Sequence, residues 1–128
     1  MKVSLDTGTA SHLIKAYDAG SIQINDTVYE RDLIVMPEAI EPDWISAPIA
    51  ELTAEHFAAV RDYGPEILLL GTGRDQVFPP ARLMADLGRR GTGLEVMDTA
   101  AACRTYNVLM SEDRRVAAAL MMIESERD

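Results

Sequence analysis

Four consecutive apolar residues, Ile67-Leu68-Leu69-Leu70, constrain the fold of this chain more than any other feature of the sequence. The run does not alternate with polar residues, so a strand built from it is buried on both faces. Strands of this kind are typical of the centre of an α/β sheet that helices cover. Gly71-Thr72-Gly73 follows directly and predicts a tight turn at the end of the strand.

A helix is predicted after this turn. Pro80 stands near its first position, where the missing N–H of proline costs nothing. Its apolar stripe contains Leu83, Met84 and Leu87. Gly91 ends it.

A strand at residues 94–97 and a second helix are predicted next. Asp98 or Thr99 caps this helix, which runs to about Leu109. Strands that alternate with helices of about ten residues predict a partly parallel sheet. The last segment, 114–123, is ambiguous. Its alanine-rich run slightly favours a helix by propensity, but a strand of small residues beneath packed helices would also fit.

A β-hairpin is predicted nearer the N-terminus. Residues 21–24 alternate polar and apolar side chains, Asn25-Asp26-Thr27 forms the turn, and residues 28–36 resume with β-branched and apolar side chains. The preceding residues, 1–19, mix both types and are a weakly defined N-terminal segment.

Three prolines, at positions 37, 42 and 48, then disfavour a long helix. Trp44 lies between them, and its bulk is expected to hold this loop against the core. Thr53 caps a predicted helix that places Phe57 and Val60 on one side. The whole chain, residues 1–128, is therefore expected to form one α/β domain.

Length and charge exclude several classes of protein. The chain has 128 residues, which suits one domain, and 48% are apolar, which is too many for a disordered chain. Twelve basic against 21 acidic residues give a net charge of −9, so binding to nucleic acid is not expected. No apolar run approaches the roughly 18 residues of a membrane span, and no signal sequence is apparent. We expect a cytoplasmic protein.

Nothing in the sequence indicates a metal centre or a cofactor. Cys103 is the sole cysteine, which excludes an internal disulfide and a cysteine-based zinc cluster. His12 and His56 are too isolated to define a metal site, and the carboxylates lack the spacing of a calcium loop.

Binding sites in open α/β sheets form beyond the carboxyl ends of the strands. Two such ends can be identified here, and they converge if the two strands are parallel neighbours. The predicted binding cleft contains Gly71, Thr72, Gly73, Arg74, Glu95, Asp98, Thr99, Cys103, Arg104 and Asn107. No catalytic residue is assigned.

Each of these features also has a purely structural interpretation. The glycine turn either cradles a ligand or is only a turn, because Gln76 replaces the third glycine of a dinucleotide fingerprint. Asp98 is either a helix cap, which is favoured, or a catalytic carboxylate. Cys103 is by default a buried apolar residue and otherwise a nucleophile that needs a base. Arg104 pairs with Glu95 or Asp98 or stays free for a partner. Glu95 lies near a sheet end or is paired, because an unpaired buried carboxylate is costly.

A longer pattern indicates a family. It comprises Gly71-Thr72-Gly73, Phe78-Pro79-Pro80, Gly93-Leu94-Glu95-Val96-Met97-Asp98-Thr99, Ala101-Ala102-Cys103-Arg104-Thr105-Tyr106-Asn107-Val108-Leu109 and Arg115-Val116-Ala117-Ala118-Ala119-Leu120. The pattern resembles the family that includes the mitochondrial NADH dehydrogenase complex I assembly factor 3 and many bacterial proteins. The resemblance spans residues 20–123 and is most specific over 93–109.

The resemblance implies a three-layer α/β fold around a mixed central sheet, with a strand at residues 115–123. The chain departs from the family near Ser111-Glu112-Asp113, where a glycine commonly follows the glutamate. The mitochondrial member helps to assemble the membrane-peripheral arm of complex I, and no catalytic residues come with the family. The resemblance therefore implies a protein partner, such as a respiratory complex subunit, for this bacterial-looking chain.

Two functions are compatible with these observations. The favoured one is a non-enzymatic interaction or assembly protein that binds its partner near the strand ends. The alternative is a small-molecule-binding protein or an enzyme that uses the predicted cleft.

Overall fold

Eight strands form two sheets in the computed structural model, which describes residues 11–44 and 46–125. The smaller sheet contains β1 (Ile14–Asp18), β2 (Ser21–Ile24) and β3 (Thr27–Tyr29). The larger contains β4 (Leu33–Met36), β5 (Ala39–Glu41), β6 (Ile67–Thr72), β7 (Gly93–Met97) and β8 (Val116–Met121). The helices are the α-helices α2 (Ala81–Gly88) and α3 (Thr99–Ser111) and the 3₁₀ helices η2 (Ile49–Glu51) and η3 (Ala54–Val60).

The larger sheet is mixed and has the strand order β5-β4-β8-β6-β7. β6 is parallel to both β7 and β8, whereas β4 is antiparallel to β8 and to β5. β6 and β8 lie side by side at the centre and are almost completely buried. The mixed central sheet and the doubly buried strand at residues 67–70 are thereby confirmed.

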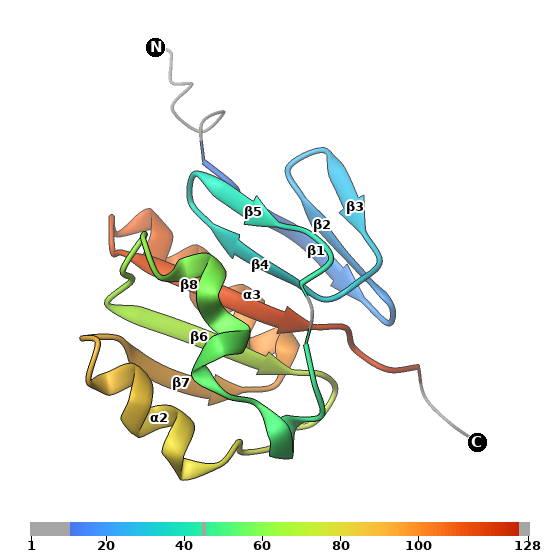
Figure 1. Ribbon diagram of the computed structural model, residues 1–128. Coiled ribbons are helices and arrows are strands. Elements are labelled where there is room, and N and C mark those ends of the chain that lie inside the picture. Colours follow the sequence, from blue (N-terminus) through green and yellow to red (C-terminus); the bar gives the residue numbers. More distant parts are fainter. Residues whose placement is uncertain (1–10, 45, 126–128) are drawn as a thin grey trace.

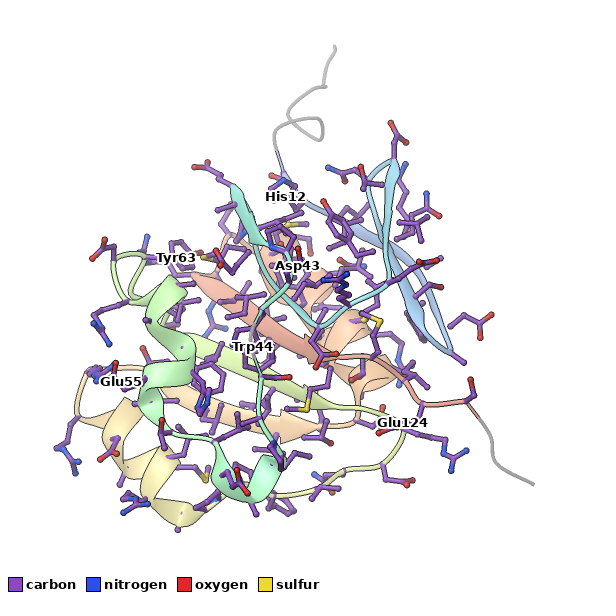
Figure 2. All side chains as sticks on the ribbon, turned by 45° about the vertical axis from the view of Figure 1, so that its right-hand side comes forward. His12, Asp43, Trp44, Glu55, Tyr63 and Glu124 are labelled. Carbon is purple, nitrogen blue, oxygen red and sulfur yellow. The ribbon has the colours of Figure 1, made fainter. Side chains whose placement is uncertain are left out.

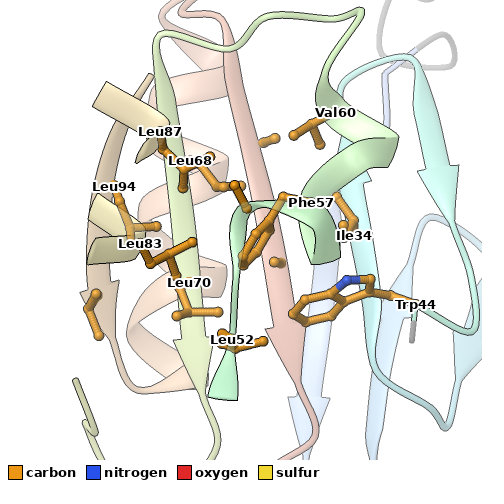
Figure 3. Close-up of a cluster of buried hydrophobic side chains, with 14 of the residues drawn as sticks. Ile34, Trp44, Leu52, Phe57, Val60, Leu68, Leu70, Leu83, Leu87 and Leu94 are labelled. Carbon is orange, nitrogen blue, oxygen red and sulfur yellow. The ribbon is translucent and has the colours of Figure 1, made fainter. Parts of the chain in front are cut away.

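Successive residues of the central strands point into two separate cores. On β6, Leu68 and Leu70 belong to the cluster that η3 and α2 complete, and Leu69 belongs to the cluster on the α3 side. Figure 3 shows the first of these clusters. Because both faces of β6 meet apolar side chains, its sequence has no polar alternation.

The elements are arranged in three layers, as the resemblance implies (Figure 1). η3 and α2 cover one face of the central sheet, and α3 and the smaller sheet lie on the other. Ile22 and Ile24 of β2 point into the core beneath α3, so the smaller sheet is part of the same domain.

The predicted hairpin is present, but its second strand is shorter than expected. β2 and β3 pair Ile22 with Tyr29 and Ile24 with Thr27, so the turn is Asn25-Asp26 alone. The chain then leaves this sheet, and Leu33–Met36 enters the central sheet as β4. The sequence pattern predicts one strand over residues 28–36, because they are mostly apolar. In the structure, β4 is buried on both faces, whereas β3 is half exposed, and the two belong to different sheets.

The weakly patterned segment 1–19 contributes β1, which pairs antiparallel with β2. Only Ile14 of this strand is buried, which explains why no clear pattern marks it. Residues 1–10 of the segment lie outside the described part of the chain.

The helix favoured by propensity at the C-terminal end is wrong, and the strand implied by the resemblance is correct. β8 lies between β4 and β6, and residues 116–120 are fully buried there. Differences in helix propensity are only a few tenths of a kcal/mol per residue, whereas pairing with two strands satisfies the backbone of the whole segment. The small alanine side chains of β8 also allow the layers on both faces of the sheet to pack close to this strand.

The expectation for Trp44 is met. Its side chain is buried, its ring centroid lies 5.4 Å from that of Phe57, and its Nε1–H donates to the carbonyl of His56 at 2.6 Å. Two details around this loop differ from the prediction. The proline-rich stretch contains β5 and η2, and the helix after Thr53 is a 3₁₀ helix interrupted at Phe57. On α2, Met84 is exposed, although it was predicted to belong to the apolar stripe of that helix.

The backbone at Ser111-Glu112-Asp113 explains how the chain forms this turn without the glycine that is common in the family. Asp113 has φ of 62°, in the left-handed region that glycine adopts most easily. Aspartate tolerates this region better than most residues, so the turn from α3 to β8 forms without glycine.

Replacing Gly71 by alanine should destabilise the domain by about 1–3 kcal/mol, because overpacking displaces neighbours in a close-packed interior. A Cβ at this position would lie 2.9 Å from Thr99 Oγ1 and 3.0 Å from Thr99 Cα. Gly88→Ala is the matched control, since a Cβ there meets nothing within 4 Å. Urea unfolding of both variants measures the difference, and equal midpoints would contradict the close contact.

Candidate functional site

The two strand ends that were expected to converge are in contact. β6 and β7 are parallel neighbours, with Gly71 opposite Met97. The backbone N–H of Thr99, which follows β7, donates to the carbonyl of Gly73, which follows β6, at 2.9 Å. The turn after β6 and the first residue of α3 therefore touch directly.

The hydroxyl of Thr99 joins three segments at this point. Its oxygen accepts the backbone N–H of Gly73 at 2.8 Å, and the hydroxyl donates to the carbonyl of Met121, the last residue of β8, at 2.6 Å. Thr99 is fully buried. The hydroxyl thus provides a hydrogen bond to two backbone groups where β6 and β8 end.

Thr72 organises the turn in a similar way. Its hydroxyl donates to the carbonyl of Asp75 at 2.5 Å, and its oxygen accepts the backbone N–H of Val77 at 3.1 Å. The side-chain amide of Gln76 donates to the carbonyl of Val96 on β7 at 3.0 Å. These bonds fix residues 72–77 across the end of the sheet. Gly71 and Thr72 still belong to β6, so the turn begins at Gly73, two residues later than predicted, and it is ordered.

Asp98 and Cys103 have the structural roles that were favoured. Asp98 is the N-cap of α3, and its carboxylate accepts the N–H of Ala101 at 2.8 Å. Cys103 is fully buried in the core beneath α3. Burial raises the pKa of its thiol to about 12, so the thiol is protonated at neutral pH and is a poor nucleophile.

Two polar residues of α3 hold the smaller sheet. The side chain of Asn107 accepts the backbone N–H of Ile14 at 3.0 Å and donates to its carbonyl at 2.7 Å. Arg104 donates to the hydroxyl of Tyr17 at 2.8 Å, in place of the predicted ion pair with Glu95 or Asp98. Both side chains therefore point toward β1, away from the turn after β6.

Glu95 is exposed on β7, the outer strand of the sheet, and needs no buried partner. Of the two alternatives, a position near a sheet end or a pair with an arginine, the structure gives an exposed position at the edge of the sheet. On the other side of the turn, the backbone N–H of Arg74 donates to Glu124 Oε1 at 3.0 Å. This hydrogen bond lowers the pKa of the Glu124 carboxyl.

An open hollow of about 440 Å³ adjoins the carboxyl ends of β6 and β8. Its lining includes Asp32, Ser46, Thr72 and Glu124. The carboxylate of Asp32 accepts the hydroxyl of Ser46 at 2.7 Å and the N–H of Met122 at 2.8 Å. Figure 2 shows Glu124 where the chain leaves β8. Asp32 and Glu124 had no signal in the sequence, because their neighbours there come from distant segments.

The turn after β6 also presents apolar side chains to solvent. Val77 is 45% exposed and Phe78 is 65% exposed, although both lie in the ordered segment between β6 and α2. The sequence analysis used Phe78 only as part of a family pattern. Its exposure could not be inferred, because an isolated phenylalanine is more often buried.

The histidines are used inside the fold. His12 Nδ1 lies 3.0 Å from the carbonyl of Met36, and His56 Nδ1 accepts the backbone N–H of Thr53 at 3.0 Å. Within the described ranges, no group of three or more His, Cys, Asp or Glu side chains could hold a metal ion. No helix in residues 11–44 or 46–125 is long and apolar enough to cross a bilayer.

Comparison with known proteins confirms the family resemblance. The family described as "Protein of unknown function (DUF498/DUF598)" matches residues 14–121. A solved crystal structure of a protein from Bordetella parapertussis superimposes with a TM-score of 0.81 and 37% identity, over 88% of this chain and 97% of that one.

Two curated relatives carry descriptive names. The "NADH dehydrogenase [ubiquinone] 1 alpha subcomplex assembly factor 3" of Danio rerio is 33% identical over 115 residues, which cover 88% of this chain and 66% of that protein. The "13 kDa major membrane protein" of Francisella tularensis is 29% identical over 108 residues, 84% of this chain and 88% of that protein. The chain thus spans about two thirds of the zebrafish protein.

Thr99→Val should lower the free energy of unfolding by about 1–3 kcal/mol, because it leaves the buried N–H of Gly73 and the carbonyl of Met121 without their partner. The variant keeps the shape of the side chain. Thr27→Val, at an exposed position of β3, is the matched control and should change stability little. Chemical denaturation followed by circular dichroism compares the two, and an unaltered Thr99→Val midpoint would rule out this role of the hydroxyl.

Proposed function

Because the chain belongs to the protein family DUF498/DUF598, we propose that it is a non-enzymatic, assembly-factor-like protein that binds a protein partner. The observation that carries this proposal is the similarity, along most of the chain, to relatives named as complex I assembly factors. A subunit of respiratory complex I is therefore the proposed partner. The buried Cys103 and the capping role of Asp98 fit a role without catalysis.

The proposed binding surface is the turn after β6, residues 73–80, which we call the β6–α2 turn. Phe78 and Val77 expose apolar area there, and aromatic side chains often dominate binding at protein interfaces. The bonds of Thr72 and Gln76 hold the turn in place before a partner arrives. An ordered turn loses little conformational entropy on binding, which favours affinity.

The proposed location is the bacterial cytoplasm, at the surface of a membrane complex. The missing bilayer-spanning helix in the described part of the chain supports a peripheral location. The relative in Francisella tularensis has a name that places it at a membrane. Binding to a subunit of a membrane complex would account for both observations.

The paired substitutions Val77→Ser and Phe78→Ser should reduce recovery of complex I subunits with the tagged chain at least about tenfold. Loss of an aromatic anchor typically costs about 2 kcal/mol or more of binding free energy. The measurement is affinity purification from the native host followed by mass spectrometry. The substitutions should barely alter stability, because both side chains are exposed.

The control for this experiment is the pair Val28→Ser and Val108→Ser. These valines are also exposed, at 56% and 55%, but lie on β3 and α3. The control should recover complex I subunits like the unaltered chain. Equal loss in both variants would contradict the proposed surface, and absence of complex I subunits from the unaltered chain would contradict the proposed partner.

A small-molecule site is the second candidate, and the hollow at the carboxyl ends of β6 and β8 supports it. Its lining includes the carboxylates of Asp32 and Glu124, which suit a cationic polar ligand. A ligand at about 100 times its dissociation constant would stabilise the fold by about 2.7 kcal/mol. A thermal-shift screen of cationic metabolites should then find a compound whose effect Glu124→Gln removes. A screen in which no compound raises the melting temperature would eliminate this candidate.

A further inference from the structure

A separate hollow of about 320 Å³ lies between η3 and α2, and we call it the η3–α2 hollow. Phe57, Val60 and Leu87 line it, and all three belong to the core cluster of that face (Figure 3). Its volume is at the lower end of the range for small-molecule sites. These three side chains are almost fully buried, so an apolar group of modest size in the hollow would contact their outer edges.

The charged side chains that line the η3–α2 hollow are both arginines, Arg61 and Arg90. Arg61 Nη2 lies 3.7 Å from Glu55 Oε1, an exposed ion pair of the kind that contributes little. Arg90 forms no ion pair with any residue that the structure describes. Both guanidinium groups can therefore bind a further anion.

The walls add no other polar side chain for a ligand. The hydroxyl of Thr92 donates to the carbonyl of Pro65 at 2.8 Å, so it is already used within the fold. A ligand that matches this lining is apolar along its length and carries one anionic group at its end. A sugar, or another molecule with polar groups on all sides, would have hydroxyls without hydrogen-bond partners against the apolar base of the hollow.

We propose that the η3–α2 hollow binds a small apolar carboxylate, with its hydrocarbon part on Phe57, Val60 and Leu87 and its carboxylate between Arg61 and Arg90. Guanidinium groups pair with carboxylates through two parallel hydrogen bonds. The chain as a whole has a net charge of −9, so an anion is retained only where cations are local. This site is independent of the proposed partner surface.

The protein contains a natural reporter for this site. Trp44 is the only tryptophan of the chain, and its ring centroid lies 5.4 Å from that of Phe57, which lines the hollow. A ligand that packs against Phe57 changes the surroundings of the indole. Its binding is therefore expected to alter tryptophan fluorescence without any added label.

The test is a titration with octanoate near neutral pH, followed by tryptophan fluorescence and, in parallel, by isothermal titration calorimetry. We expect saturable binding with a dissociation constant below about 1 mM, the range for a ligand of this size. Octanol has the same hydrocarbon chain without the charge. It should bind at least about tenfold more weakly, because it lacks charge-assisted hydrogen bonds.

The double variant Arg61→Gln and Arg90→Gln should weaken octanoate binding at least about tenfold. Arg82→Gln is the matched control, since Arg82 is an exposed arginine of α2 that does not line the hollow. It should bind octanoate like the unaltered chain. Circular dichroism confirms that each variant is folded before it is titrated.

Three outcomes would each overturn the proposal. The first is the absence of saturable octanoate binding in both measurements. The second is equal affinity for octanol, which would show that the arginines do not select a carboxylate. The third is unaltered binding by the folded double variant, which would place the ligand elsewhere.

Discussion

The buried hydroxyl of Thr99 holds together the end of the sheet on which the rest of the structure depends. It connects the turn after β6 to the last residue of β8, while Asp98 beside it caps α3 at the end of β7. Three parallel strands are thus fixed at their carboxyl ends by two adjacent residues. The close approach of Thr99 to Gly71 leaves no room for a side chain there. The ends of β6 and β7 do lie side by side as expected, but Thr99 fills the space where a ligand was expected.

This packing explains why, at this end of the sheet, the features that could bind something lie around the strand ends and not between them. The β6–α2 turn carries Val77 and Phe78 outward, and the carboxylates of Asp32 and Glu124 line a hollow beside β6 and β8. Arg104 and Asn107 are engaged with β1 instead. A rigid base with exposed apolar groups suits recognition of another protein better than chemistry at a buried nucleophile.

The central strands also explain how one short chain supports two cores. β6 and β8 present alternate residues to the α2 side and to the α3 side, so each strand serves both layers. On the α2 side, a 3₁₀ helix and a loop anchored by Trp44 complete the cover where a longer helix would be usual. The η3–α2 hollow lies in this less regular cover, next to the arginines at its edge.

The sequence by itself determined the α/β class, the doubly buried strand at residues 67–70, the cap at Asp98 and the role of Trp44. Each of these depends on local patterns: an unbroken apolar run, a capping residue before a helix, or a single bulky side chain in a loop. The family pattern added the three layers and β8. Only the tertiary structure decided that β4 leaves the hairpin and that Arg104 faces Tyr17. These outcomes depend on contacts between residues far apart in the chain, and local propensity is too weak to determine them.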